Sequence, residues 1–394
     1  MAALPGKVGL VDRAQGPGGG GRSVAGVGVS AGLGGGVGGG TGAGGAHAGG
    51  SGGRGWLGMP LPYRVPRPAH FRLNGLPEPV EMVDLSVPDL PADLEGMTIL
   101  HLSDLHVRRR WRASRLVGGG RGGGRAGQLG GLGGGTVLAR LADALPGLRP
   151  DVVCLTGDYA DGPGDGAAAG LAVAQLVARV RPRWGCWGVF GNHDAPAVRA
   201  AVRAATAGRV TWLEDRLSEA GEEGGVGGGA SCQPLPAGLR LLGLNWPEDP
   251  FAVLRRAGEA EAATREGLVI TLAHAPGAIV HCSRLAVRLP LVLCGHTHGG
   301  QIRLGGWVLH TSSDLPGRWA AGVVRARRPD GGSTLGCISR GLGEAAWPGL
   351  RFGCRPQAPL YVLRRGAAAG VNGAATQRNG AMGGDGGVEV VLRW

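Results

Sequence analysis

Short apolar runs recur along the chain from residue 97 onward, and most end in glycine and in side chains able to bind a metal ion. The clearest case is the run 291–294, which leads into a His-x-His pattern flanked by glycines at 295–301. Runs of this length and composition are typical of buried strands. Glycine lets the backbone turn sharply and approach an ion, and imidazole is the commonest metal ligand near neutral pH. The pattern therefore predicts strands that carry metal ligands at their carboxyl ends.

Helical patterns separate many of these runs, so the chain alternates strands with helices. Helices are predicted at 136–145 and 171–180, from Pro196 onward, and at 251–265. Strands are predicted at 97–102, 151–156, 187–190, 239–244, 268–272, 291–294, 307–310, 335–339 and 360–363. This alternation predicts an α/β fold in which helices cover the sheet faces. The chemistry of such folds lies at the carboxyl ends of the strands.

Glycine, 82 of 394 residues, marks the segments outside this pattern. Residues 1–55 are rich in glycine and cannot bury enough apolar surface to offset chain entropy, so we expect them to be disordered. Residues 56–96 form a proline-rich lead-in that we expect to pack on the domain, with 82–87 as an edge strand; a membrane contact at 61–66 is the alternative. We place a single domain at 97–365, with glycine-rich inserts at 118–135 and 218–230, and a flexible tail at 366–394.

The formal net charge of +12 is compatible with nucleic acid, an anionic membrane or an acidic substrate. The basic residues are almost all arginine in a chain rich in alanine and glycine, which favours compositional bias or a solvated surface. Nucleic-acid binding by the Arg/Gly segments is an alternative that we do not expect, because residues 1–55 lack interleaved Phe and Tyr.

The seven cysteines include no C-x-x-C pair, so we expect no disulfide framework. The chain has no apolar run of about 18 residues and no secretory signal pattern. We therefore expect a cytoplasmic protein, or one held peripherally at a membrane.

Five of the predicted strands end in possible metal ligands. These are Asp104 and His106, Asp158, Asn192 and His193, His274, and His296 and His298. A single histidine at a strand end is commonly structural, but five such endings in succession indicate a shared site. Mixed nitrogen and oxygen ligands suit Mn, Fe or Zn. Their number fits two divalent ions about 3.5–4 Å apart that share a carboxylate.

The motifs Asp-x-His, Gly-Asp, Gly-Asn-His-Asp, a lone His and Gly-His-x-His, in this order, resemble those of the calcineurin-like metallophosphoesterases over about 97–365. The sequences at 103–106, 295–301 and 339–343, with Arg351-Phe352 and Arg355-Pro356, are similar to the YkuE-like branch, which is related to UDP-2,3-diacylglucosamine hydrolases. The resemblance implies a four-layer α/β/β/α sandwich with two mixed sheets and a dimetal centre on its rim.

The resemblance also implies roles for individual residues. Asp104, His106 and His298 would hold one metal, Asn192, His274 and His296 the other, and Asp158 would bridge them. His193 would act as general acid or charge stabiliser, oriented by Asp194. Asp161 is either close to the metals or a turn residue. Arg340 is a candidate contact for the substrate phosphate, and a structural salt bridge is the equal alternative.

The expected function is dimetal-dependent hydrolysis of a phosphomonoester or phosphodiester, including lipid- or nucleotide-linked pyrophosphate, by in-line attack of a hydroxide shared by the metals. The expected partner is a phosphorylated small molecule or lipid. A non-catalytic metal-binding scaffold is the alternative from another class. The sequence does not indicate the oligomeric state.

Overall fold

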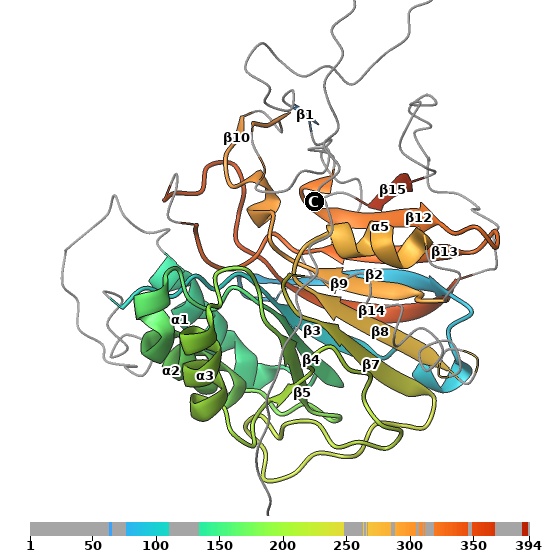
Figure 1. Cartoon of the computed structure of the whole chain (residues 1–394), viewed down its shortest axis with the longest axis horizontal. Helices are drawn as coiled ribbons and strands as arrows, with labels where there is room; N and C mark the ends of the chain where they lie inside the picture. Colours follow the sequence, from blue (N-terminus) through green and yellow to red (C-terminus); the bar gives the residue numbers. More distant parts are fainter. Residues whose placement is uncertain are drawn as a thin grey trace, which may run out of the picture. The chain divides into compact units, whose positions relative to one another are not determined.

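Two six-stranded sheets form the centre of the fold (Figure 1). The computed structural model describes residues 63–64, 76–109, 134–247, 263, 265, 267–284, 288–304, 307–309, 311, 319–345, 349–366 and 388–392. The first sheet has the order β2 (Val80–Pro88), β14 (Ala358–Gly366), β3 (Thr98–Leu102), β4 (Val152–Thr156), β5 (Cys186–Val189) and β6 (Thr211–Trp212). The second has the order β15 (Val388–Leu392), β12 (Gly322–Arg327), β13 (Ser333–Ile338), β9 (Leu291–Cys294), β8 (Leu268–Ala273) and β7 (Leu239–Leu244).

Both sheets are mixed. Strands β3 to β6 run parallel, whereas β14 is antiparallel to β3. In the second sheet β7, β8, β9 and β13 run parallel, and β12 is antiparallel to β13. A small third sheet pairs β11 (Trp307–Val308) with β1 (Tyr63–Arg64) and β10 (Arg303–Leu304). The parallel order places the carboxyl ends of β3, β4 and β5 at one edge.

Apolar side chains divide these elements into four layers. One cluster lies between the sheets and includes Trp187, Ile270 and Leu293. A second lies under α1 (Gly134–Ala144), α2 (Gly166–Val177) and α3 (Pro196–Ala205) on the first sheet. A third lies under α5 (Gly277–Arg284) on the second sheet. Strands buried on both faces read as continuous apolar runs, and the α/β/β/α sandwich is confirmed.

Most predicted elements are present, with shifted ends. The edge strand expected at 82–87 is the longer β2, which pairs with β14 along nine residues. Strand β12 and helix α5 were not predicted, because β12 is interrupted by arginines and α5 starts at a Pro-Gly pair that reads as a turn. The predicted helix at 251–265 lies outside the described residues except for 263 and 265.

Part of the expected flexible tail is a strand, and the glycine-rich insert at 218–230 packs closely on the fold. Residues 388–392, expected in a flexible tail, form β15 and pair with β12. The insert at 218–230 packs against the first sheet, because Gly225 exchanges backbone hydrogen bonds with Cys186 at the start of β5. Residues 1–55, most of the insert at 118–135 and residues 367–387 lie outside the described part. Among the described residues, no helix is both long and apolar enough to cross a lipid bilayer.

The packing of the 218–230 segment predicts a large effect at Gly225. A Cβ atom there would lie 2.2 Å from the backbone of Arg209 and Val210, so Gly225→Ala requires the backbone to move. We expect a loss of about 1–3 kcal/mol in the free energy of unfolding, measured by denaturant titration. Gly164→Ala is the matched control, since its Cβ meets nothing within 4 Å. Equal stabilities of the two variants would contradict close packing of this segment.

Candidate metal centre

Five of the predicted ligands have an unusual backbone conformation. Their φ angles are positive, at 52° for Asp104, 42° for His106, 57° for Asp158, 70° for His296 and 51° for His298. Non-glycine residues seldom adopt this region, at a cost of about 1–3 kcal/mol each. Hydrogen bonds across the centre hold it: Asp104 N–H donates to Gly157 O, and His106 N–H donates to Asp158 O. Backbone strain concentrated at five residues of one cluster of ligands is typical of a functional site.

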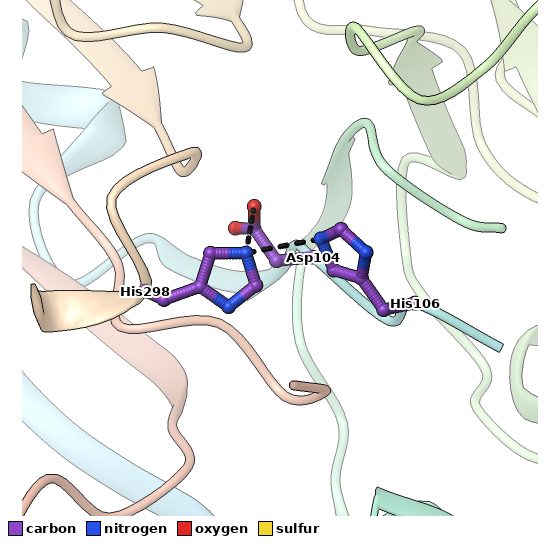
Figure 2. Close-up of side chains that lie close together, drawn as sticks. All are labelled: Asp104, His106 and His298. Atoms are coloured by element: carbon purple, nitrogen blue, oxygen red, sulfur yellow. Dashed lines mark hydrogen bonds and ion pairs between the residues drawn. The ribbon is translucent and has the colours of Figure 1, made fainter. Parts of the chain in front are cut away.

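The first ligand cluster is buried and joins β3 to the loop after β9. The side chains of Asp104, His106 and His298 converge from these two segments (Figure 2). His298 Nε2 lies 3.0 Å from His106 Nε2 and 3.6 Å from Asp104 Oδ1. The backbone N–H of His296 also donates to Asp104 Oδ1 at 2.9 Å, which fixes the carboxylate against the loop.

The second cluster contains Asp158, His274 and His296. His274 Nε2 lies 3.1 Å from Asp158 Oδ2 and 3.2 Å from His296 Nδ1. Asn192 Oδ1 lies between the two rings, 2.9 Å from His274 Nε2 and 3.0 Å from His296 Nδ1. His296 and His298, one residue apart, therefore contribute to different clusters.

One oxygen of Asp158 faces both clusters. Its Oδ2 atom lies 3.1 Å from His274 Nε2 and 3.5 Å from His106 Nε2. The other oxygen, Oδ1, accepts a hydrogen bond from the backbone N–H of His193 at 2.8 Å. A carboxylate oxygen placed between two sets of ligands would allow Asp158 to contact two cations.

Two glycines make room for these carboxylates. A Cβ at Gly191 would lie 2.2 Å from Asp158 Oδ1, and a Cβ at Gly295 would lie 2.2 Å from Asp104 Oδ2. Any other residue at either position would displace a carboxylate. The glycines that flank the motifs in the sequence are thus required for close approach.

The donor set fits divalent cations. In each cluster two imidazole nitrogens face each other at 3.0–3.2 Å beside a carboxylate oxygen. Ring nitrogens that face each other at this distance either share one N–H hydrogen, as donor and acceptor, or both bind a cation that lies between them. Nitrogen and oxygen donors in this mixture suit Mn, Fe or Zn better than Ca or Mg.

The charges around Asp158 also indicate a cation site. Burial alone would lower the pKa of His106 and of His274, but hydrogen bonding and the charge of Asp158 raise these pKa values to about 9 and about 10. Burial would raise the pKa of Asp158, yet the two imidazoles hold it well below its ordinary value. In the metal-free protein, protons therefore take the place of the positive charge.

His193 lies beside both clusters, but Asp194 does not orient it. The half-buried ring packs edge-on against His106, with 4.7 Å between ring centroids. Its Nδ1 lies 2.8 Å from the carbonyl oxygen of Asp161, so Nδ1 carries the proton and donates. The Asp161 carboxylate contacts His106 Nδ1 at 3.3 Å and Arg108 Nε at 2.9 Å. Asp161 thus positions two histidines, a role that the sequence left open between a metal-site residue and a turn.

Asp194 instead organises the backbone at the ends of β4 and β5. Its carboxylate accepts hydrogen bonds from the backbone N–H groups of Asp158, Tyr159 and Gly191 at 2.8–2.9 Å. Burial and the nearby Asp158 charge raise the pKa of Asp194 to about 6. The His193 ring is oriented instead by the carbonyl oxygen of Asp161, to which its Nδ1 donates.

Arg340 forms the structural salt bridge that was the alternative to a phosphate contact. Its Nη2 atom lies 2.5 Å from Glu81 Oε1, and its Nε donates to Arg355 O at 2.8 Å. The side chain is buried, with 5% of the residue exposed. Its guanidinium therefore ties β2 to the segment after β13.

Arg351 stabilises the loop that carries His298, a role that the sequence did not reveal. Its guanidinium donates to His298 O at 3.0 Å and to Arg340 O at 2.8 Å. Cys354 Sγ also donates to His298 O, at 3.3 Å. Trp246 stacks on His296 with 5.7 Å between centroids. The sequence pair Arg351-Phe352 was noted as part of a motif, but the carbonyl groups that Arg351 binds belong to segments distant in the chain.

The role of Asp194 can be tested with Asp194→Asn. The amide nitrogen would face a backbone N–H group that now donates to a carboxylate. We expect the free energy of unfolding to fall by about 1–3 kcal/mol, because a buried donor loses its acceptor. Thermal melting of the metal-free protein measures this loss. Unchanged stability with reduced activity would instead support a contact with His193.

The raised pKa values predict that metal binding releases protons. His106 and His274 are protonated at pH 7 in the metal-free fold, because their pKa values exceed the ordinary 6.5. The stabilisation from these charged rings is complete below pH 6.5 and is lost as the pH rises through about 9 to 10. Each metal that displaces one proton should bind about tenfold more tightly per pH unit between pH 7 and 8.5.

Calorimetric titration with Mn²⁺ in two buffers of different ionisation enthalpy measures this release. Binding heats that are the same in both buffers would contradict proton release on metal binding.

Comparison with known proteins agrees with this geometry. The family model described as calcineurin-like phosphoesterase matches residues 97–300. The chain is 27% identical over 246 residues to the "Transmembrane protein with metallophosphoesterase domain" of Danio rerio, covering 59% of this chain and 48% of that protein. It is 25% identical over 277 residues to the "Uncharacterized metallophosphoesterase YkuE" of Bacillus subtilis (strain 168), covering 70% of this chain and 82% of the relative. The chain thus spans about half the length of the zebrafish relative. The matching model covers more than half of the chain, the motifs converge on neighbouring groups of possible metal ligands, and the chain belongs to the calcineurin-like phosphoesterase family.

Proposed function

We propose that the protein is a dimetal-dependent phosphoesterase that hydrolyses a phosphomonoester or a phosphodiester, with lipid- or nucleotide-linked pyrophosphates among the candidate substrates. The observation that carries this proposal is the Oδ2 atom of Asp158, which faces His106 and His274 at 3.5 and 3.1 Å. The family relationship supports the same reaction class.

Asp104, His106 and His298 would hold one cation, and Asn192, His274 and His296 would hold the other. Asp158 would contact both. Mn, Fe and Zn are the metals that this donor set favours. When bound, two such cations lower the pKa of a shared water and neutralise charge on the phosphoryl oxygens.

The substrate approaches from the side of Asn192 and His193. Asn192 is exposed and His193 is half-buried, whereas Asp104, His106 and Asp158 are fully buried. Because His193 Nδ1 donates to Asp161 O, its ring is fixed and Nε2 is the atom left for substrate. A proton held at Nε2 would stabilise charge on the phosphoryl group or pass to the leaving oxygen.

Hydrolysis of bis-p-nitrophenyl phosphate by the Mn²⁺-loaded protein tests the proposal. Asp158→Asn should abolish activity together with metal binding, because both clusters lose their shared ligand. His193→Ala should keep the metals and lower kcat by about 10²- to 10⁴-fold, the usual contribution of a positioned acid. His281→Ala, a half-buried histidine of α5, is the matched control and should remain active.

Metal analysis beside the assay separates the outcomes. Protein that binds the metals without hydrolysing phosphate esters from a substrate panel would favour the non-catalytic scaffold. Activity that survives in Asp158→Asn would rule out this centre as its source.

A further inference from the structure

Three buried polar side chains lie in the otherwise apolar layer between the two sheets. His101, Ser103 and Thr156 are each 0% exposed. His101 is on β3 and Ser103 follows that strand, while Thr156 ends β4, the parallel neighbour of β3 (Figure 1). Ile99 and Cys154, two residues before His101 and Thr156, belong to the apolar cluster between the sheets. Residues two apart on a strand share a face, so His101 and Thr156 point into that layer.

Hydrogen bonds join these side chains into a row, which we call the polar chain. Thr156 Oγ1 donates to Ser103 Oγ at 2.8 Å, and it lies 2.8 Å from His101 Nε2. Because a hydroxyl has one hydrogen, Thr156 Oγ1 accepts from His101 Nε2–H. Burial lowers the pKa of His101 to about 3, so the ring is neutral at pH 7.

The polar chain is not explained by packing. Among the described residues, His101 Nδ1 has no hydrogen-bond partner, and the ring lies 6.1 Å from that of Tyr361. A buried polar atom without a partner lowers the stability of a fold. An apolar side chain would fill the position of His101 at less cost, so the imidazole indicates a role other than packing.

One end of the polar chain holds two strained turns. Ser103 directly precedes Asp104, whose φ is 52°. Thr156 directly precedes Gly157 and Asp158, whose φ angles are 95° and 57°. The bond between the two hydroxyls therefore joins the residues at which both turns begin. It limits how far the two carboxylates can move relative to each other.

The second sheet meets the polar chain at two points. His274 Nδ1 lies 2.8 Å from the carbonyl oxygen of Thr156, so Nδ1 carries the proton and donates. A Cβ atom at Gly295 would overlap Ser103 Oγ, so the Ser103 hydroxyl lies against the turn that leads to His296. Ligands that follow β3, β4, β8 and β9 are thus all close to the polar chain.

We propose that His101, Ser103 and Thr156 are positioning residues for the metal centre: the polar chain holds the two strained turns and the His274 ring in the geometry that binds the cations. His101 acts through Thr156 and would touch neither metal nor substrate. The inference rests on the metal assignment of the proposed function, but it requires no hydrolysis. Loss of a group that orients a metal ligand commonly weakens metal binding by about 10- to 100-fold.

Calorimetric titration of the metal-free, whole chain with Mn²⁺ tests the polar chain at Thr156. Thr156→Val removes the hydroxyl and keeps the shape, so Mn²⁺ binding should weaken by about 10- to 100-fold. Thr156→Ser keeps the hydroxyl and should bind Mn²⁺ nearly as wild type does. Thr334→Val is the matched control, because Thr334 is a buried threonine of β13 whose hydroxyl has no hydrogen-bond partner among the described residues.

His101→Leu separates positioning from a purely structural role. The substitution removes an unpartnered nitrogen from an apolar layer, so the melting temperature of the metal-free protein should stay the same or rise. Mn²⁺ binding should nevertheless weaken by about tenfold, because Thr156 loses the group that holds its hydroxyl. A lower melting temperature with unchanged Mn²⁺ affinity would show that His101 only supports the fold.

Hydrolysis of bis-p-nitrophenyl phosphate, measured beside the titrations, separates this inference from the proposed function. Wild-type Mn²⁺ affinity in both Thr156→Val and His101→Leu overturns the positioning role and leaves the proposed function intact. Wild type that binds no Mn²⁺ overturns both. Wild type that binds two Mn²⁺ ions without hydrolysis, with weaker binding in the two variants, supports the positioning role and removes the proposed function.

Discussion

The carboxylate of Asp158 is the point on which the rest of the centre depends. One of its oxygens faces an imidazole from each cluster, and the other accepts the backbone N–H of His193. Asp158 follows β4, while its neighbours come from the ends of β3, β5 and β8. The sandwich brings together the carboxyl ends of parallel strands from both mixed sheets, and Asp158 lies between the ligands that those ends carry.

Holding these ligands without cations is costly. Five residues adopt positive φ angles, and two pairs of histidine rings face one another at 3.0–3.2 Å. The structure offsets this cost with buried polar contacts just outside the clusters. Asp194 binds three backbone N–H groups, and Arg351 binds carbonyl groups around His298. Cations that bind the folded state alone would stabilise it further by mass action.

The same buried contacts connect the centre to the surface. Arg303 and Arg351 fix the loop around His298 from below, while Leu304 and Phe352, next to them in the chain, project to solvent. Successive side chains of a strand point to opposite faces, so residues that hold the metal-binding loop lie next to exposed apolar residues. Loss of those apolar side chains need not disturb the centre, because the buried partners remain.

The sequence by itself determined the layered fold, the ligand types and the order of the motifs. Apolar runs of strand length and glycines beside Asp and His are local signals, so the strand ends that carry Asp104, Asp158 and His274 were predictable. The division of His296 and His298 between two metals followed from the family motif, and the structure places them in separate clusters.

Only the tertiary structure decided which polar groups meet. The Asp194 carboxylate binds backbone N–H groups and not His193. Arg340 forms an ion pair with Glu81, 259 residues away in the chain. Asp161 contacts His106 through its carboxylate and His193 through its carbonyl oxygen. The register of β10 and β11 pairs Leu304 with Trp307, and β12 with β15 completed the second sheet. Hydrogen-bond partners are selected by distances of about 3 Å between segments far apart in the chain. Local sequence patterns do not encode those distances.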